Sequence, residues 1–170
     1  RAQEAEFLAA SNTGRLPHGW LLTGPKGIGK ATFAWRAARF ILATPEAEAD
    51  GLFGAPPVPE NLDIDPGHPV ARRLLALSEP GLLLLRRPWD PDNKRLKTQL
   101  TVDEVRGLKG FFRMSAGAGR RVVSVDSADE MNAAAANALL KELEEPPKGA
   151  VLLLISHRPS GRLPTIRSRC

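Results

Sequence analysis

A glycine-rich run, Gly24-Pro25-Lys26-Gly27-Ile28-Gly29-Lys30-Ala31-Thr32, lies between two apolar segments. It satisfies G-x-x-x-x-G-K, in which glycines let backbone N–H groups surround a phosphate and the lysine adds a positive charge. The next position should carry a hydroxyl for Mg²⁺, but Ala31 has no ligand atom. Thr32 lies about 100° further round a helix, so its hydroxyl should point elsewhere. The run predicts a loop that holds a nucleotide but hydrolyses it poorly.

The segments on either side of the loop have the periodicity that this motif requires. Residues 19–23 predict a short strand, and residues 31–42 predict a helix whose apolar face contains Phe33, Ala37 and Phe40 or Ile41. A strand, a glycine loop and a helix in this order place phosphates at a helix N-terminus. A glycine-rich turn without a ligand is the alternative interpretation.

Length and composition limit the class of protein. The 170 residues suit one domain, with an irregular excursion at about residues 44–69 and a basic loop at about residues 87–100. The net charge of +5 favours acidic partners such as a nucleotide or DNA. One cysteine excludes an internal disulfide and a cysteine-built zinc site. No apolar run is near 18 residues long, and there is no apolar signal stretch. We therefore expect a cytoplasmic protein without a membrane partner.

Apolar runs alternate with helical patterns along the rest of the chain. Strands are expected at residues 82–86, 121–125 and 151–156, and helices at residues 4–10, 70–77, 132–144 and 163–168. Another helix should begin after Thr101, with Glu104 completing a capping box and Val102, Val105, Leu108 and Phe112 on its apolar face. This alternation predicts a mostly parallel sheet with helices on both faces, a three-layer α/β/α fold whose ligands lie at the carboxyl ends of the strands.

Asp126 directly follows the apolar run at residues 121–125. In P-loop ATPases an Asp at such a strand end lies beside the phosphate loop and holds Mg²⁺, although it can also simply cap a turn. A glutamate that orients the attacking water often follows, but here the residue is Ser127. Position 31 lacks the hydroxyl that would bind Mg²⁺, and position 127 lacks the carboxylate that would orient water. We therefore expect negligible ATP hydrolysis and no tightly held Mg²⁺. The histidine spacing indicates no other metal site.

Two further runs carry a specific resemblance. Residues 137–147 are NALLKELEEPP, and the chain ends Leu163-Pro164-Thr165-Ile166-Arg167-Ser168-Arg169-Cys170. With RLPH at residues 15–18, these runs resemble bacterial clamp loaders, the AAA+ subunits of DNA polymerase III. The resemblance covers residues 15–170, implies the AAA+ form of the P-loop NTPase fold, and implies that the lid and collar domains of the family are absent from this stretch.

Within that family, the motor subunits gamma and tau carry G-K-[ST] and Asp-Glu, whereas delta-prime subunits keep Ser-Arg-Cys beside a degenerate nucleotide site. Ala31 and Ser127 make this chain resemble delta-prime. The resemblance implies a non-motor subunit that binds ATP or ADP weakly or not at all. Its implied partners are gamma/tau and delta and, indirectly, the sliding clamp and primer-template DNA. An active gamma/tau-like ATPase and a generic nucleotide-sensing DNA-binding module are the alternatives.

The resemblance also assigns roles to single residues. In the family, the arginine of Ser-Arg-Cys reaches across the subunit interface to the γ-phosphate held by a neighbour, which makes Arg169 an arginine finger in trans and Arg167 its rival. The polar residue that senses the γ-phosphate would be Ser156 or His157. Family members commonly carry a four-cysteine zinc module after the P-loop helix, but residues 44–69 contain no cysteine, so no zinc is expected.

Overall fold

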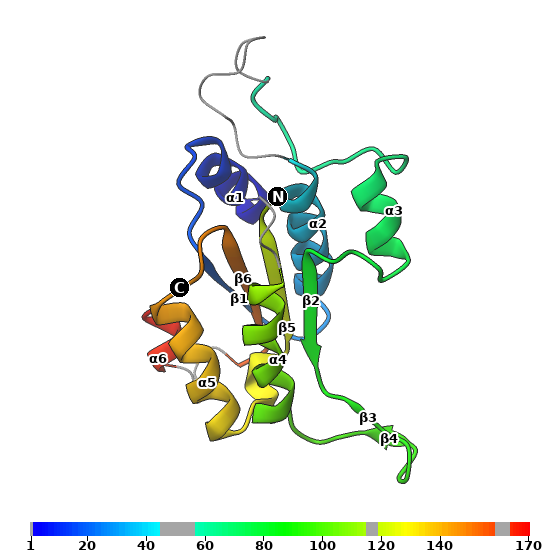
Figure 1. Ribbon diagram of the computed structural model, residues 1–170. Coiled ribbons are helices and arrows are strands. Elements are labelled where there is room, and N and C mark those ends of the chain that lie inside the picture. The colour runs from blue at the N-terminus through cyan, green and yellow to red at the C-terminus, as the bar shows by residue number, and fades with distance from the viewer. Residues whose placement is uncertain (1, 45–56, 115–118, 159–163) are drawn as a thin grey trace.

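The computed structural model describes residues 2–44, 57–114, 119–158 and 164–170 (Figure 1). Its central sheet has four parallel strands in the order β1-β6-β5-β2. These strands are β1 (Gly19–Thr23), β2 (Leu82–Arg86), β5 (Arg121–Asp126) and β6 (Ala150–Ser156). The predicted parallel sheet is confirmed, and each strand lies where its apolar run was found.

Helices cover both faces of this sheet, as the sequence predicted (Figure 1). They are α1 (Ala2–Asn12), α2 (Lys30–Ala43), α3 (Pro69–Leu75), α4 (Val102–Arg113), α5 (Ala133–Glu144) and α6 (Pro164–Arg167), with a 3₁₀ turn at Ala128–Glu130. Helices α1 and α2 pack on one face, and α4 and α5 pack on the other. Helix α3 packs on α2, away from the sheet.

Strand β6 shows how the sequence builds both layers of the core. Its side chains alternate between faces because a strand has a period of two residues. Val151, Leu153 and Ile155 join the cluster of α1 and α2, whereas Leu152 and Leu154 join the cluster of α4 and α5. All seven residues of the strand are buried, which explains why residues 150–156 are almost continuously apolar.

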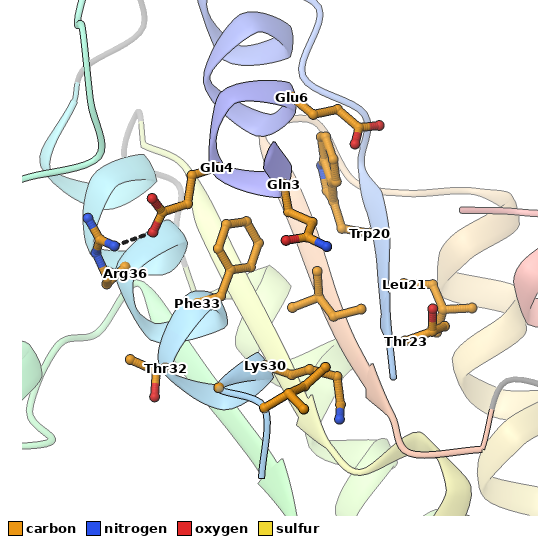
Figure 2. Close-up of a pocket in the computed structure, with 13 residues that line it drawn as sticks. Gln3, Glu4, Glu6, Trp20, Leu21, Thr23, Lys30, Thr32, Phe33 and Arg36 are labelled. Atoms are coloured by element: carbon orange, nitrogen blue, oxygen red, sulfur yellow. Dashed lines mark hydrogen bonds and ion pairs between the residues drawn. The ribbon is translucent and has the colours of Figure 1, made fainter. Parts of the chain in front are cut away.

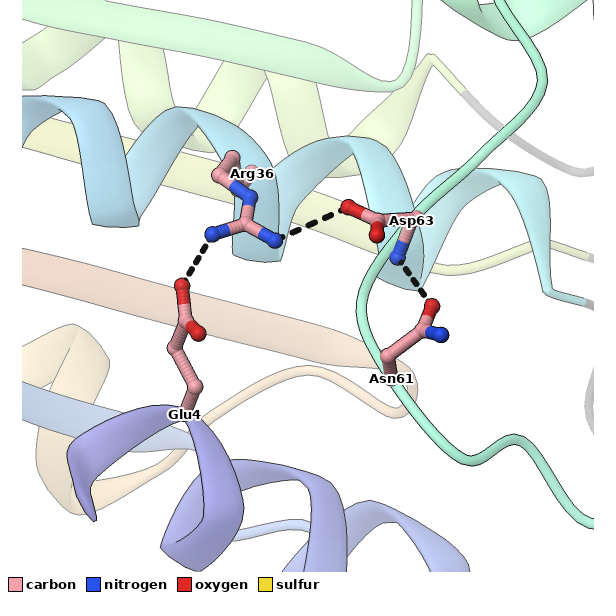
Figure 3. Close-up of polar contacts among 4 residues, drawn as sticks. All are labelled: Glu4, Arg36, Asn61 and Asp63. Atoms are coloured by element: carbon pink, nitrogen blue, oxygen red, sulfur yellow. Dashed lines mark hydrogen bonds and ion pairs between the residues drawn. The ribbon is translucent and has the colours of Figure 1, made fainter. Parts of the chain in front are cut away.

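The excursion predicted at residues 44–69 is only partly surface structure. Residues 45–56 lie outside the described residues, and residues 57–68 contain no helix or strand. Leu62, however, is 2% exposed and packs in the cluster of α1 and α2. Nearby, Arg36 of α2 forms ion pairs with Glu4 of α1 and with Asp63, the latter at 2.9 Å (Figure 3). The segment around Leu62 is therefore held against the core.

The basic loop predicted at residues 87–100 contains a β-hairpin. Strands β3 (Trp89–Asp90) and β4 (Arg95–Leu96) pair antiparallel, and the hairpin projects from the sheet (Figure 1). Hydrogen bonds from the Asn93 side chain and backbone lower the pKa of the Asp90 carboxyl, with a smaller contribution from the Asp92 backbone. The basic loop of the sequence thus includes a short two-stranded hairpin.

The capping box predicted at the start of α4 is present. The backbone N–H and the hydroxyl of Thr101 both donate to Glu104 Oε2, each at 2.7 Å. Desolvation alone would raise the pKa of Glu104, but the hydrogen bonds from Thr101 outweigh it and lower the pKa. Phe112 packs against the core cluster as a partly buried side chain, and Phe111, which the spacing did not single out, is buried beside it.

Thr101→Ala should lower the free energy of unfolding by about 1 kcal/mol at neutral pH, because it removes a helix cap. Because folding lowers the pKa of Glu104, the stability that its carboxylate contributes is present above its ordinary pKa of 4.5 and is lost as the pH falls through the folded-state pKa. Urea unfolding between neutral and acidic pH should show this loss in the wild type and a flatter profile in Thr101→Ala. An equal dependence of unfolding free energy on pH in the two proteins would contradict this role of the Thr101–Glu104 contact.

Candidate functional site

The glycine loop joins β1 to α2, as the motif requires. Gly24, Gly27 and Gly29 have φ values of +142°, +88° and +93°, which favour glycine because other residues rarely adopt them. A Cβ at Gly24 would also lie 2.6 Å from Ile28 Cδ1. The glycines are therefore needed for the path of the chain from the end of the strand into the helix.

Lys30 is the first residue of α2 and is 8% exposed. Its Nζ donates to the carbonyl oxygens of Gly24 and Pro25 at 2.7 and 2.6 Å. The ammonium group is thus held over the loop by two neutral acceptors. An incoming phosphate would offer it charged acceptors, which form stronger hydrogen bonds with an ammonium group.

A cavity of about 480 Å³ lies beside this loop at the carboxyl ends of the strands. We call it the phosphate cavity. It is lined by Lys26, Gly27, Gly29, Lys30, Ala31, Thr32, Arg86, Arg87, Leu96, Asp126, Glu130 and His157. Asp126, the last residue of β5, therefore lies beside the glycine loop. Six of the nine predicted loop residues thus line one cavity with Asp126, whereas Gly24, Pro25 and Ile28 do not line it.

The residues that follow Asp126 do not restore a catalytic carboxylate. Ser127 is 1% exposed and does not line the cavity. The Asp129 carboxylate accepts hydrogen bonds from the Ser156 hydroxyl at 2.8 Å and from the His157 backbone N–H. Of the two polar residues at the end of β6, only His157 lines the phosphate cavity.

Two basic residues of the cavity were not predicted as site residues from the sequence. Arg86 ends β2 and lies in register with Asp126 on the neighbouring strand. Arg87 follows and pairs with Glu130, with a distance of 2.8 Å between Nε and Oε2. The sequence feature that could have pointed to Arg86 is its position at the end of a predicted parallel strand, where the ligand-binding residues of such sheets lie.

A second groove, of about 460 Å³, adjoins the loop between α1, β1 and α2 (Figure 2). It shares Gly29, Lys30 and Thr32 with the phosphate cavity. Its walls combine apolar side chains such as Trp20 and Phe33 with polar groups from α1. The groove and the phosphate cavity therefore lie on either side of the start of α2.

Arg169 lies at the opposite end of β1 from the glycine loop. Its guanidinium pairs with Glu144, the last residue of α5, with Nη2 and Oε1 3.3 Å apart. A Cβ at Gly19, the first residue of β1, would lie 3.4 Å from the Arg169 carbonyl oxygen and 3.2 Å from Cys170 Sγ. Glycine at position 19 thus lets this segment lie close to the strand.

The described residues contain neither a membrane-spanning helix nor a cluster of metal ligands. Across residues 2–44, 57–114, 119–158 and 164–170, no helix is long and apolar enough to span a membrane. In the same part of the chain, no group of three or more His, Cys, Asp or Glu side chains is arranged to hold a metal ion.

The sheet order and the glycine loop between β1 and α2 define an α/β fold of the AAA+ type. A crystal structure of a gamma subunit-related protein of DNA polymerase III from Thermotoga maritima has this fold, with a TM-score of 0.58 and 22% identity over 96% of this chain and 43% of that chain. A family model described as "DNA polymerase III, delta subunit" matches residues 2–170. The chain belongs to that family, whose members include clamp loader subunits.

Individual relatives agree with this assignment. The chain is 38% identical to the DNA polymerase III subunit delta' of Pseudomonas aeruginosa, over 99% of this chain and 46% of that protein. It is 31% identical to the delta' subunit of Bacillus subtilis, over 92% of this chain and 41% of the relative. The gamma/tau subunit of Mycobacterium tuberculosis is also 31% identical, over 97% of this chain and 25% of that protein. The chain therefore spans less than half the length of these relatives, and the predicted resemblance to delta-prime is confirmed.

Proposed function

We propose that this chain is the nucleotide-binding-like part of a non-motor subunit of a bacterial DNA polymerase III clamp loader, and that Arg169 serves ATP bound by a neighbouring subunit. The position of Arg169 carries this proposal. It lies near the first residue of β1, whereas the glycine loop begins after the last. Five extended residues span about 16 Å, and Arg169 does not line the phosphate cavity of its own chain.

The contact with Glu144 is weak enough to be exchanged for a phosphate. The side chains of Arg169 and Glu144 are 53% and 40% exposed. An exposed ion pair contributes only about 0–1 kcal/mol. A phosphate offers the planar guanidinium two acceptors and a larger charge. The Arg169 guanidinium can therefore leave Glu144 and bind a phosphate on a neighbouring subunit at little cost in free energy.

The chain's own nucleotide site is proposed to be degenerate. Residues 24–32 and Asp126 would receive the phosphates of ATP or ADP, and the groove of Figure 2 would receive the nucleoside. Ala31 supplies no metal ligand, and Ser127 is buried away from the cavity. We expect weak or absent nucleotide binding, no tightly held Mg²⁺ and no zinc.

The implied partners are the other subunits of the loader. Gamma/tau would hold the nucleotide that Arg169 reaches, and delta would complete the assembly. Contact with the sliding clamp and primer-template DNA would be indirect. The 31% identity to gamma/tau subunits supports a second candidate function, an active motor ATPase. Positions 31 and 127 favour the non-motor function.

The isolated chain should show no steady ATP hydrolysis, because metal placement and the water-orienting carboxylate are both missing. A coupled phosphate-release assay, run with and without Mg²⁺, measures this directly. Lys30→Ala provides the control for contaminating ATPases, since it removes the loop's only buried ammonium group. Turnover by the wild type that disappears in Lys30→Ala would favour the motor function.

A further inference from the structure

We infer that the Arg86 guanidinium replaces Mg²⁺ in the phosphate cavity, so that this cavity binds the polyphosphate of a nucleotide without a metal ion. The inference deepens the proposed degenerate nucleotide site and rests on it. It begins with three residues that meet at one place: Ala31, Arg86 and Asp126 line both the phosphate cavity and a smaller one of about 200 Å³ beside it.

The sheet places Arg86 next to the strand-end carboxylate. Strands β2 and β5 are parallel, and Arg86 and Asp126 are register partners at their last residues. Partners in register direct their side chains to the same face of a sheet. Within the described part of the chain, no hydrogen bond or ion pair engages either the Arg86 guanidinium or the Asp126 carboxylate. Both groups therefore remain available to a ligand.

The charges of the cavity favour a polyanion even without a metal. Four basic side chains, from Lys26, Lys30, Arg86 and Arg87, face two carboxylates. One of these carboxylates, Glu130, is already paired with Arg87. Of the remaining three basic groups, only Arg86 lies beside Asp126 on the neighbouring strand.

Asp126 explains why a cation is needed at this point. A carboxylate beside bound phosphates repels them, and in metal-dependent P-loop sites Mg²⁺ removes that repulsion. Here Ala31 cannot contribute the direct ligand that holds the ion. A guanidinium can take over the charge, because its planar fork can bond a carboxylate along one edge and phosphate oxygens along another. Arg86, whose backbone is in register with Asp126 on the neighbouring strand, would make both contacts when phosphates are bound.

The test is equilibrium binding of ADP to the 170-residue chain, measured by calorimetry in EDTA and again with Mg²⁺. The wild type should bind ADP in EDTA with an affinity within about twofold of that in Mg²⁺. Arg86→Gln should weaken binding in EDTA about tenfold or more, since a bidentate charged contact is lost. Arg86→Lys should recover only part of the loss, because a point charge lacks the fork.

Arg106→Gln is the matched control. Arg106 is an exposed arginine of α4 that pairs with Asp103 and does not line the cavity, so its removal should leave ADP binding unchanged. Three results would overturn the inference: binding that requires Mg²⁺, equal affinities for wild type and Arg86→Gln in EDTA, or no ADP binding by the wild type under either condition. None of them bears on Arg169, whose role depends on a neighbour's nucleotide.

Discussion

Arg169→Ala should slow DNA- and clamp-stimulated ATP hydrolysis by the assembled loader while leaving the subunit folded. An arginine supplied in trans is worth about 10³–10⁵ in rate at the site that it serves. In the proposed assembly, the site served by Arg169 should lose nearly all of its turnover, and total hydrolysis should fall only in part because other subunits would serve the other sites. The free energy of unfolding should change by no more than about 1 kcal/mol, since among the described residues the Arg169 side chain makes a single, exposed ion pair, with Glu144.

Two variants distinguish the role of the Arg169 guanidinium from that of its ion pair with Glu144. Arg169→Lys should turn over ATP as slowly as Arg169→Ala, because an ammonium group cannot engage two phosphate oxygens in a planar fork. Glu144→Gln removes the partner of Arg169 in the free subunit but not the guanidinium, so it should retain wild-type turnover. An Arg169→Ala loader that assembles and hydrolyses ATP at the wild-type rate would exclude the proposed role.

Leu139→Ala should destabilise the chain by about 2–5 kcal/mol, the usual cost of a cavity left by a buried leucine. Leu139 is fully buried between α5 and the sheet. The neighbouring Leu140 belongs to the same NALLKELEEPP run but is only partly buried, so Leu140→Ala is the matched control and should cost clearly less. Equilibrium unfolding in guanidinium chloride measures the difference in unfolding free energy between the two variants. Equal losses would show that the helix is rotated from its described position.

Features encoded locally could be predicted from the sequence. The glycine loop, the capping box at Thr101 and the alternation of strands with helices each depend on neighbouring residues, and all three are present. The apolar face of α4 is local as well, although the spacing left out Phe111. Val105, Leu108 and Phe111 at intervals of three residues form the buried face of α4, whereas Phe112 lies at its margin.

Features that depend on strand order could not be predicted in this way. Arg86 and Asp126 are 40 positions apart, and only the adjacency of β2 and β5 brings them into register. The pairing of Arg36 with Asp63 likewise requires that the segment after α2 return across the helix. The sequence indicated that position 127 lacks a carboxylate, but the burial of Ser127 away from the cavity follows only from the fold.

The central claim, that Arg169 serves a neighbour's ATP while this chain turns over none, is tested most directly by the pre-steady-state burst of ATP hydrolysis in the assembled loader. The burst amplitude counts competent sites. Arg169→Ala should lower it by one site per assembly, and Lys30→Ala, which alters only this chain's own loop, should leave the count unchanged. A burst that loses one site in Lys30→Ala and none in Arg169→Ala would contradict the account.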